Sequence, residues 1–131
     1  MGRIDTSDIV GEITWFKVVD KNFWSLKLVD IELGGKSLGL CTGEKSCLVT
    51  PDTGTSCMTF PGWAFDQVSH LLPNNEECDS DREYPTLTYI LEDEQGLTRR
   101  FDLESERYVS IEEGRKGRKN CSSVISELNI K

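Results

Sequence analysis

The stretch CLVTPDTGTSCMTF, residues 47–60, places an acid, three hydroxyl groups and a glycine between two apolar flanks. These polar positions are residues 52–56, Asp-Thr-Gly-Thr-Ser, and they follow a segment that reads as the end of a strand. A given pentapeptide arises by chance in roughly one chain in ten thousand of this length. We therefore interpret it as a loop that holds one carboxylate in a fixed pose, rather than as an ordinary polar turn.

Each residue type in this loop has a chemical task. Asp52 supplies the carboxylate, and Gly54 allows the backbone to bend so that an N–H group approaches it. The hydroxyl groups are donors that can fix the orientation of the carboxylate. A carboxylate that accepts several hydrogen bonds stays ionised more easily.

The segments before the loop have the composition of strands. Residues 12–19, EITWFKVV, are rich in β-branched and aromatic residues, which favours a strand. In residues 22–33 the apolar alternation slips by one position, from Trp24, Leu26 and Leu28 to Val29, Ile31 and Leu33. Such a slip predicts a β-bulge. Gly34-Gly35 predicts a turn, and residues 37–41 and 46–50 predict short strands around a turn at 42–45.

The segments after the loop predict one helix and then more strands. Residues 62–72 follow Pro61 and carry apolar side chains at helical spacing, and Pro73 ends the pattern. Those side chains are Ala64, Val68, Leu71 and Leu72. Residues 84–103 predict a hairpin that turns near Gln95-Gly96, and residues 107–111 predict one more strand. The expected fold is mostly β with a single short helix after the loop.

Composition limits the class of protein. At 131 residues, with 37% hydrophobic and 29% charged residues, the chain is expected to form one soluble globular domain. Its formal charge of −8 argues against nucleic-acid binding, which needs a basic face. We interpret the basic run at residues 115–119 as a solvated loop. No apolar run is long enough to span a membrane, and the start does not resemble a signal peptide.

Five cysteines are many for a reducing compartment, so we expect disulfides in an oxidising one, with one thiol left over. A zinc site is the rival interpretation, but the spacing matches no common ligand set and His70 is the sole imidazole in the sequence. We predict no metal and no cofactor, and no role for His70. A nucleophilic role for Cys57 lacks a base placed by the sequence. Trp63 and Phe65 are expected to be core contacts.

The loop in this setting resembles the catalytic loop of pepsin-like aspartic proteases, specifically that of their C-terminal half. The chain is similar to cathepsin D-like and plasmepsin-like members over nearly its whole length, 1–131. The segment GEITWFKVVDKNFWSLKLVDIELGG looks like the strands that open this half, PGWAFDQVSHLL like the helix after the loop, and YPTLTYIL like a later strand. By this resemblance Cys41 pairs with Cys47 and Cys78 pairs with Cys121.

The resemblance also implies roles for the loop residues. Asp52 would be the second of two catalytic aspartates that share a proton and hold a water between them. Thr53 would tie the two halves together beneath the pair, Gly54 would donate its N–H to the inner carboxylate oxygen, and Thr55 would bind the outer one. Ser56 would face the substrate backbone.

Three departures from the family pattern bear on activity. The sequence contains one Asp-Thr-Gly, so we expect the chain alone to be inactive and its partner to be the missing N-terminal half. The family continues with an apolar-apolar-Gly strand that this sequence lacks, so we expect a fragment that stops before it. Pro51 stands where the family usually has an aliphatic residue, which can displace the loop slightly.

The leading prediction is therefore an aspartic endopeptidase with peptide or protein substrates, located in the secretory pathway, in an acidic vacuole or lysosome-like compartment or outside the cell. One alternative is a retropepsin-like homodimer, although the hairpin at residues 92–100 lacks a glycine-rich tip. Another alternative is a non-catalytic binding protein with a protease-like fold.

Overall fold

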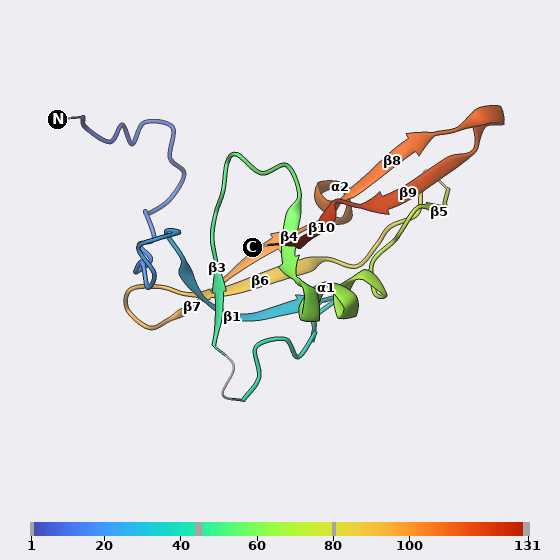
Figure 1. Ribbon diagram of the computed structural model, residues 1–131. Coiled ribbons are helices and arrows are strands. Elements are labelled where there is room, and N and C mark those ends of the chain that lie inside the picture. Colours follow the sequence, from blue (N-terminus) through green and yellow to red (C-terminus); the bar gives the residue numbers. More distant parts are fainter. Residues whose placement is uncertain (1, 44–45, 80, 130–131) are drawn as a thin grey trace.

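The computed structural model describes residues 2–43, 46–79 and 81–129, and strands predominate in them (Figure 1). In chain order the elements are β1 (Leu26–Leu33), β2 (Lys36–Ser37), β3 (Cys47–Val49), β4 (Met58–Pro61), α1 (Gly62–Ser69), β5 (Glu76–Glu77), β6 (Leu87–Glu92), β7 (Thr98–Leu103), α2 (Ser105–Tyr108), β8 (Val109–Glu113), the 3-10 turn η1 (Arg115–Gly117), β9 (Lys119–Ser123) and β10 (Ile125–Leu128). The expected mostly-β fold is confirmed, with α1 directly after the loop.

The main sheet is built around β1 and β6. Along one edge β1 pairs antiparallel with β6, and along the other it pairs first with β3 and then with β2. The outer neighbour of β6 is β7, and the two form the predicted hairpin. Asp93 closes its turn by accepting hydrogen bonds from the backbone N–H groups of Gln95 and Leu97. The turn at Gly34-Gly35 is also confirmed, and both glycines have the positive φ that this turn requires.

The predicted bulge lies in β1. The register between β1 and β6 shifts between Leu28 and Asp30, so that Val29 is the extra residue. Leu28 and Ile31 are three positions apart and would face opposite sides of a regular strand, yet both are buried in the same core. The slip in the hydrophobic alternation therefore predicted the bulge correctly.

Two smaller sheets complete the fold. Strands β4 and β10 pair in parallel. Strand β9 pairs antiparallel with β5 and β8, and this three-stranded arm extends away from the body in Figure 1. A disulfide between Cys78 and Cys121 ties the chain beside β5 to β9. The sequence did not predict β10 or its parallel pairing.

Helix α1 packs on the core with part of the predicted apolar face. Ala64 and Val68 are buried, and Leu72 is buried just beyond the helix. The helix ends at Ser69, three residues before the pattern ends, and Leu71 is 53% exposed. Placing Leu71 on the core face was therefore wrong, because the backbone leaves the helical path before that residue.

The strand predicted at residues 12–19 is absent from the structure. That segment is extended, but no described strand runs beside it. Its backbone makes single contacts instead, with the Trp15 carbonyl accepting from Glu94 N–H and Val19 N–H donating to the Ser25 carbonyl. A strand needs a ladder of partners for its N–H and C=O groups, which composition alone cannot supply.

Two further strand predictions were partly wrong. Of residues 37–41 only Ser37 lies in a strand, and of residues 107–111 the first two belong to the single turn α2. Residues 44 and 45 of the predicted 42–45 turn lie outside the described residues. Neither α1 nor α2 has the length and apolar composition that a membrane-spanning helix needs, and this finding covers the described residues.

Candidate functional site

The loop with Asp52 connects two different sheets. It leaves β3, which pairs with β1, and it enters β4, which pairs with β10. At its start the hydroxyl groups of Ser25 and Thr50 lie 2.9 Å apart in a hydrogen bond. At its end Met58 N–H donates to the Val124 carbonyl over 3.0 Å. Each end of the loop is thus fixed by contacts that are distant in sequence.

The Asp52 carboxylate accepts a hydrogen bond at each oxygen. Thr55 donates its hydroxyl to Oδ2 over 2.5 Å, and Gly54 donates its backbone N–H to Oδ1 over 2.9 Å. The bond from Thr55, which has the larger effect, and the bond from Gly54 hold the pKa of Asp52 below its ordinary value. Desolvation of the carboxylate acts in the opposite direction but is the smallest of the three effects. The side chain is exposed, so it remains accessible to water and to a ligand.

The missing side chain at Gly54 leaves room for this close approach. A Cβ added at Gly54 would lie 3.2 Å from Asp52 Oδ1, a tighter contact than most Cβ atoms make. An alanine would therefore push the carboxylate away from the N–H group that it accepts from. The predicted contacts of Gly54 and Thr55 with Asp52 are present in the structure.

The other two loop residues do not contact the carboxylate. Thr53 is exposed, and its side chain makes no hydrogen bond to a described residue. The Ser56 hydroxyl is also exposed and lies 3.8 Å from the Cys57 sulfur. Cys57 is a free, partly buried thiol. The roles assigned to Thr53 and Ser56, beneath the catalytic pair and against the substrate, remain predictions.

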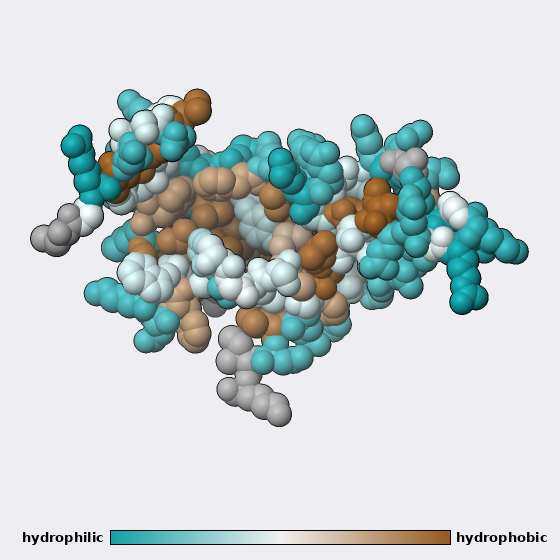
Figure 2. Space-filling model, turned by 90° about the horizontal axis from the view of Figure 1, so that it is seen from above, coloured by the Kyte–Doolittle hydropathy of each residue, from teal (hydrophilic) through white to brown (hydrophobic). Residues whose placement is uncertain are grey.

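A groove of about 1100 Å3 runs beside the loop. Asp52 and Thr55 border it, and most of its wall is apolar. Figure 2 looks down on the molecule and shows hydrophobic residues reaching the hollowed middle of that face. The lining includes Met58, Trp63 and Tyr89. Such a groove can take apolar side chains of a ligand that lies next to the carboxylate.

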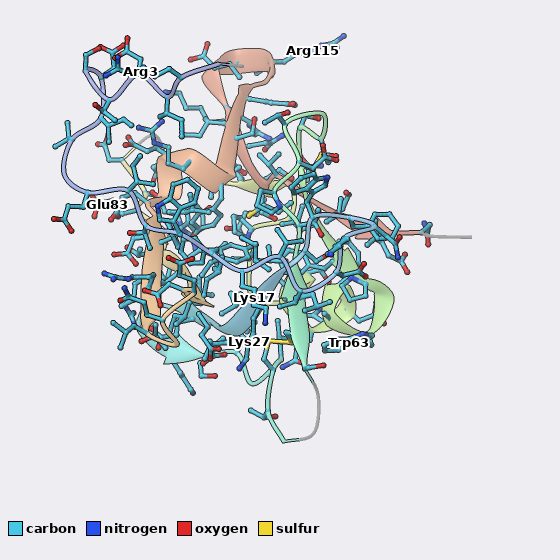
Figure 3. All side chains as sticks on the ribbon, turned by 90° about the vertical axis from the view of Figure 1, so that its left-hand side faces the viewer. Arg3, Lys17, Lys27, Trp63, Glu83 and Arg115 are labelled. Atoms are coloured by element: carbon cyan, nitrogen blue, oxygen red, sulfur yellow. A yellow bond between two sulfur atoms is a disulfide. The ribbon has the colours of Figure 1, made fainter. Side chains whose placement is uncertain are left out.

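The environment of Trp63 was predicted wrongly. It is 53% exposed and lines the groove, instead of packing in the core. In Figure 3 it lies on α1, the helix whose buried residues are Ala64 and Val68. One step along a helix turns a side chain by about 100°, and this step carries Trp63 off the face that buries Ala64. Phe65 does pack against the core, as expected.

Sequence reasoning missed the contact that joins the groove wall to the main sheet. Tyr89 on β6 donates its hydroxyl to the Met58 sulfur on β4 over 3.3 Å. Burial raises the pKa of Tyr89 to about 12, so the hydroxyl stays protonated over the physiological range. The two residues are 31 positions apart, and no local pattern in the sequence indicates that they meet.

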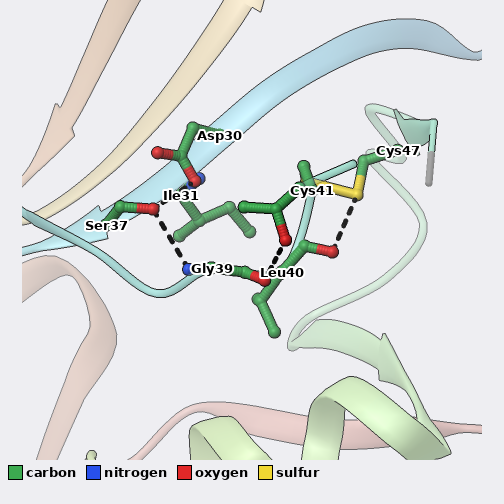
Figure 4. The surroundings of a disulfide bond; sticks show 8 residues. Asp30, Ile31, Ser37, Gly39, Leu40, Cys41 and Cys47 are labelled. Carbon is green, nitrogen blue, oxygen red and sulfur yellow. Dashed lines mark hydrogen bonds between the residues drawn. A yellow bond between two sulfur atoms is a disulfide. The ribbon is translucent and has the colours of Figure 1, made fainter. Parts of the chain in front are cut away.

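Both predicted disulfides are present. The Cys41–Cys47 bond closes a short loop directly before β3, as Figure 4 shows. The Ser37 hydroxyl donates to Asp30 and accepts from Gly39 N–H, which anchors the start of this segment to β1 (Figure 4). Among residues 2–43, 46–79 and 81–129, no group of three His, Cys, Asp or Glu side chains could hold a metal ion.

Comparisons with known proteins agree with this geometry. The family model for eukaryotic aspartyl protease matches residues 1–130. Mouse (Mus musculus) gastricsin is 29% identical over an alignment of 137 residues, which covers 98% of this chain and 32% of gastricsin. Gastricsin from Callithrix jacchus is 32% identical over 101 residues, covering 69% of this chain and 25% of that protein.

Plasmepsin VIII from Plasmodium berghei is 28% identical over 99 residues, covering 74% of this chain and 26% of the plasmepsin. The chain thus spans about a third or less of the length of the curated relatives that it matches. The family model nevertheless covers almost all of it, including the loop at residues 52–56. The chain belongs to the eukaryotic aspartyl protease family.

Proposed function

We propose that this chain is the C-terminal lobe of a pepsin-like aspartic endopeptidase and that Asp52 is one of its two catalytic aspartates. The observation that carries the proposal is the pair of donors on the Asp52 carboxylate, one from Gly54 at 2.9 Å and one from Thr55 at 2.5 Å. The groove beside the loop supports it, because a peptide needs a channel that passes the catalytic group.

In the proposed reaction Asp52 faces a second aspartate, and the two carboxyl groups share one proton. Like charges at close range cannot both ionise, so the two pKa values separate, a known property of such pairs. The ionised carboxylate takes a proton from a water held between them, and the protonated one donates to the carbonyl oxygen of the peptide bond. The bonds from Gly54 and Thr55 favour the ionised form of Asp52.

The neighbouring loop residues have supporting roles in this proposal. The Thr53 hydroxyl would tie the two lobes together beneath the aspartates, and Ser56 would bind the peptide backbone of the substrate. Both side chains are exposed in the isolated chain, which leaves them accessible to a partner lobe or a substrate.

The isolated chain is proposed to be inactive. It supplies one carboxylate in an Asp-Thr-Gly loop, and with its pKa lowered this group is a base without a neighbouring acid. The partner is the N-terminal half of the same protease, and the substrates are peptides or proteins. The disulfides Cys41–Cys47 and Cys78–Cys121 support a route through the secretory pathway to an acidic or extracellular compartment.

A peptidase assay tests the proposal. The chain is combined with the N-terminal half of a pepsin-like protease and assayed with a fluorogenic peptide from pH 3 to 6. We expect turnover from the combination and none from either half alone. Asp52→Asn should abolish the turnover, because an amide cannot hold or release the shared proton. The control is Asp66→Asn, which changes an exposed acid on α1 and should leave the rate unchanged.

Two results would contradict the proposal. Equal activity of the Asp52→Asn variant and the parent combination would remove Asp52 from the reaction. The chain alone could also show turnover that is lost in Asp52→Asn, together with a dimer in gel filtration. That result would indicate a homodimeric protease instead of a two-lobe one.

A further inference from the structure

Residues 120–122, Asn-Cys-Ser, match the acceptor pattern for N-linked glycans, in which Asn is followed by any residue except Pro and then by Ser or Thr. The motif lies in β9, the central strand of the three-stranded arm. A short motif of this kind becomes informative when the fold leaves the Asn side chain accessible. The environment of Asn120 meets that condition.

Asn120 is half-buried and lies on the face of the arm away from the disulfide. Its direct neighbours across the sheet are Glu77 on β5 and Glu112 on β8, and both are exposed. Cys121, the next residue, is 1% exposed and points to the opposite face, where it bonds to Cys78. Because side chains alternate along a strand, Asn120 and Ser122 share the face away from the disulfide.

The surroundings of Asn120 leave space for a substituent on its side-chain amide. An open cavity of about 410 Å3 borders it, lined also by Glu77 and by residues of the hairpin tip, Gly114, Arg115, Lys116 and Arg118. The tip of the β8–β9 hairpin projects away from the body in Figure 1, and Figure 3 labels Arg115 at this tip. The side-chain amide makes no hydrogen bond to a described residue. A substituent on its nitrogen would therefore break no hydrogen bond to the part of the chain that the structure describes.

We propose that Asn120 is an N-glycosylation site. In this group transfer the amide nitrogen Nδ2 attacks the anomeric carbon of a polyisoprenyl-pyrophosphate-linked oligosaccharide. The C–N bond forms as the carbon–oxygen bond to pyrophosphate breaks, the polyisoprenyl pyrophosphate leaves with the electron pair, and the amide gives up one proton. The inference rests on the secretory route proposed above but not on the catalytic role of Asp52.

The structure also implies that glycosylation takes place before the arm folds. In the folded arm β9 is paired on both edges, and Cys121, in the middle of the acceptor motif, is bonded to Cys78. An enzyme that must bind residues 120–122 as a free segment therefore has to act before these bonds form. The glycan is attached to the unfolded chain and then remains on the outer face of the arm.

Expression of the full chain behind a cleavable signal peptide in a yeast secretory host tests the proposal. Total chain from cells and medium is treated with a peptide N-glycosidase, which removes the glycan and converts the modified Asn to Asp, and is then analysed by peptide mass spectrometry. We expect a shift in gel mobility on treatment and Asp at position 120. Asn120→Gln and Ser122→Ala should both abolish the shift.

Matched variants separate the motif from general effects on folding. Ser122→Thr preserves the acceptor pattern and should keep the glycan, and Asn75→Gln changes an Asn outside the motif and should keep it as well. Asp52→Asn should also remain glycosylated, so that failure of the proposed catalysis and failure of this site are distinguishable. Cys78→Ser prevents closure of the disulfide. The glycosylated fraction of this variant should therefore equal or exceed that of the parent chain.

An unmodified Asn120 peptide in the parent chain would overturn the proposal. So would a shift that survives in Asn120→Gln, because the glycan would then lie elsewhere. Modification of the Cys78→Ser variant alone would also overturn it, since it would mean that folding of the parent chain excludes the transferase.

Discussion

The pose of Asp52 is determined within four residues of chain. Its donors belong to Gly54 and Thr55, two and three positions further on, and Thr55 N–H also approaches the Asp52 carbonyl at 3.4 Å. Such short-range bonds form whenever the backbone adopts the loop conformation. The loop can therefore keep its carboxylate oriented although the group is exposed.

Replacing Thr55 by Val should raise the pKa of Asp52 toward its ordinary value of about 3.9. The Thr55 hydroxyl is the largest cause of the lowered pKa, and valine keeps the shape but loses the donor. The pKa is measured by following the Asp52 carboxyl carbon in an NMR titration. Thr53→Val is the control, because the Thr53 side chain makes no hydrogen bond to the carboxylate, and it should leave the titration unchanged.

The sign of the pH effect follows from the lowered pKa. The stability that the Asp52 bonds contribute is present above the unfolded-state pKa and is lost as the pH falls through the lower folded-state pKa. Thr55→Val should therefore reduce the loss of stability on acidification. An identical pKa of Asp52 in Thr55→Val and in the parent chain would contradict this account.

Among the elements, β1 depends on a single extra residue. Val29 allows Leu28 and Ile31 to enter one core, opposite Leu91 and Tyr89 of β6. Without it, the alternation of side chains would carry one of the two out of the core. The bulge thus connects the half of β1 that supports β3 and the loop at residues 52–56 to the half that forms the hairpin with β2.

Deletion of Val29 should lower the free energy of unfolding by about 2–5 kcal/mol, the usual loss for a Leu or Ile removed from a core. Val29→Ala keeps the bulge and removes a partly buried side chain, so it should cost about 1 kcal/mol. Urea unfolding followed by tryptophan fluorescence measures both values. Equal losses for the two variants would show that the register does not depend on the extra residue.

Helix α1 offers a second test, because it separates two residues that the sequence pattern grouped together. Val68→Ala should destabilise the chain by about 2 kcal/mol, since Val68 is fully buried. Leu71→Ala should change the stability by less than about 0.5 kcal/mol, although it removes more carbon atoms, because Leu71 is 53% exposed. Thermal and urea unfolding of both variants give the comparison, and the reverse order would contradict the early end of the helix.

At the scale of the whole molecule, the two disulfides constrain very different lengths of chain. Cys41 and Cys47 are 6 residues apart, whereas Cys78 and Cys121 are 43 apart and hold the projecting arm together. A cross-link restricts the unfolded chain more when the loop it closes is longer. The long-range bond is therefore expected to contribute more to the stability of this fold.

Replacing both Cys78 and Cys121 by Ala should lower the free energy of unfolding by about 4 kcal/mol, and replacing both Cys41 and Cys47 by about 2 kcal/mol. Chemical unfolding under non-reducing conditions measures both losses. A larger loss for the short loop would mean that contacts near Cys41 in the native state, rather than restriction of the unfolded chain, determine the contribution.

Much of the fold and of the candidate site was predictable because its causes are local. The bulge at Val29, the Gly34-Gly35 turn and the hairpin at Gln95-Gly96 each follow from residues within one strand or turn. The loop composition also indicated hydrogen-bond donors for Asp52, and the family resemblance assigned them to Gly54 and Thr55. The family resemblance further supplied the disulfide pairing, which spacing alone leaves open.

The sequence by itself thus determined the pose of Asp52 and most of the strands, since hydrogen bonds and alternation over a few residues need no distant partner. Only the tertiary structure decided that residues 12–19 lack a strand partner among the described residues, that β4 pairs with β10, and that Trp63 lines the groove. These features depend on which segments meet in space. Strand pairing and burial are properties of both partners, and one partner's sequence does not specify the other.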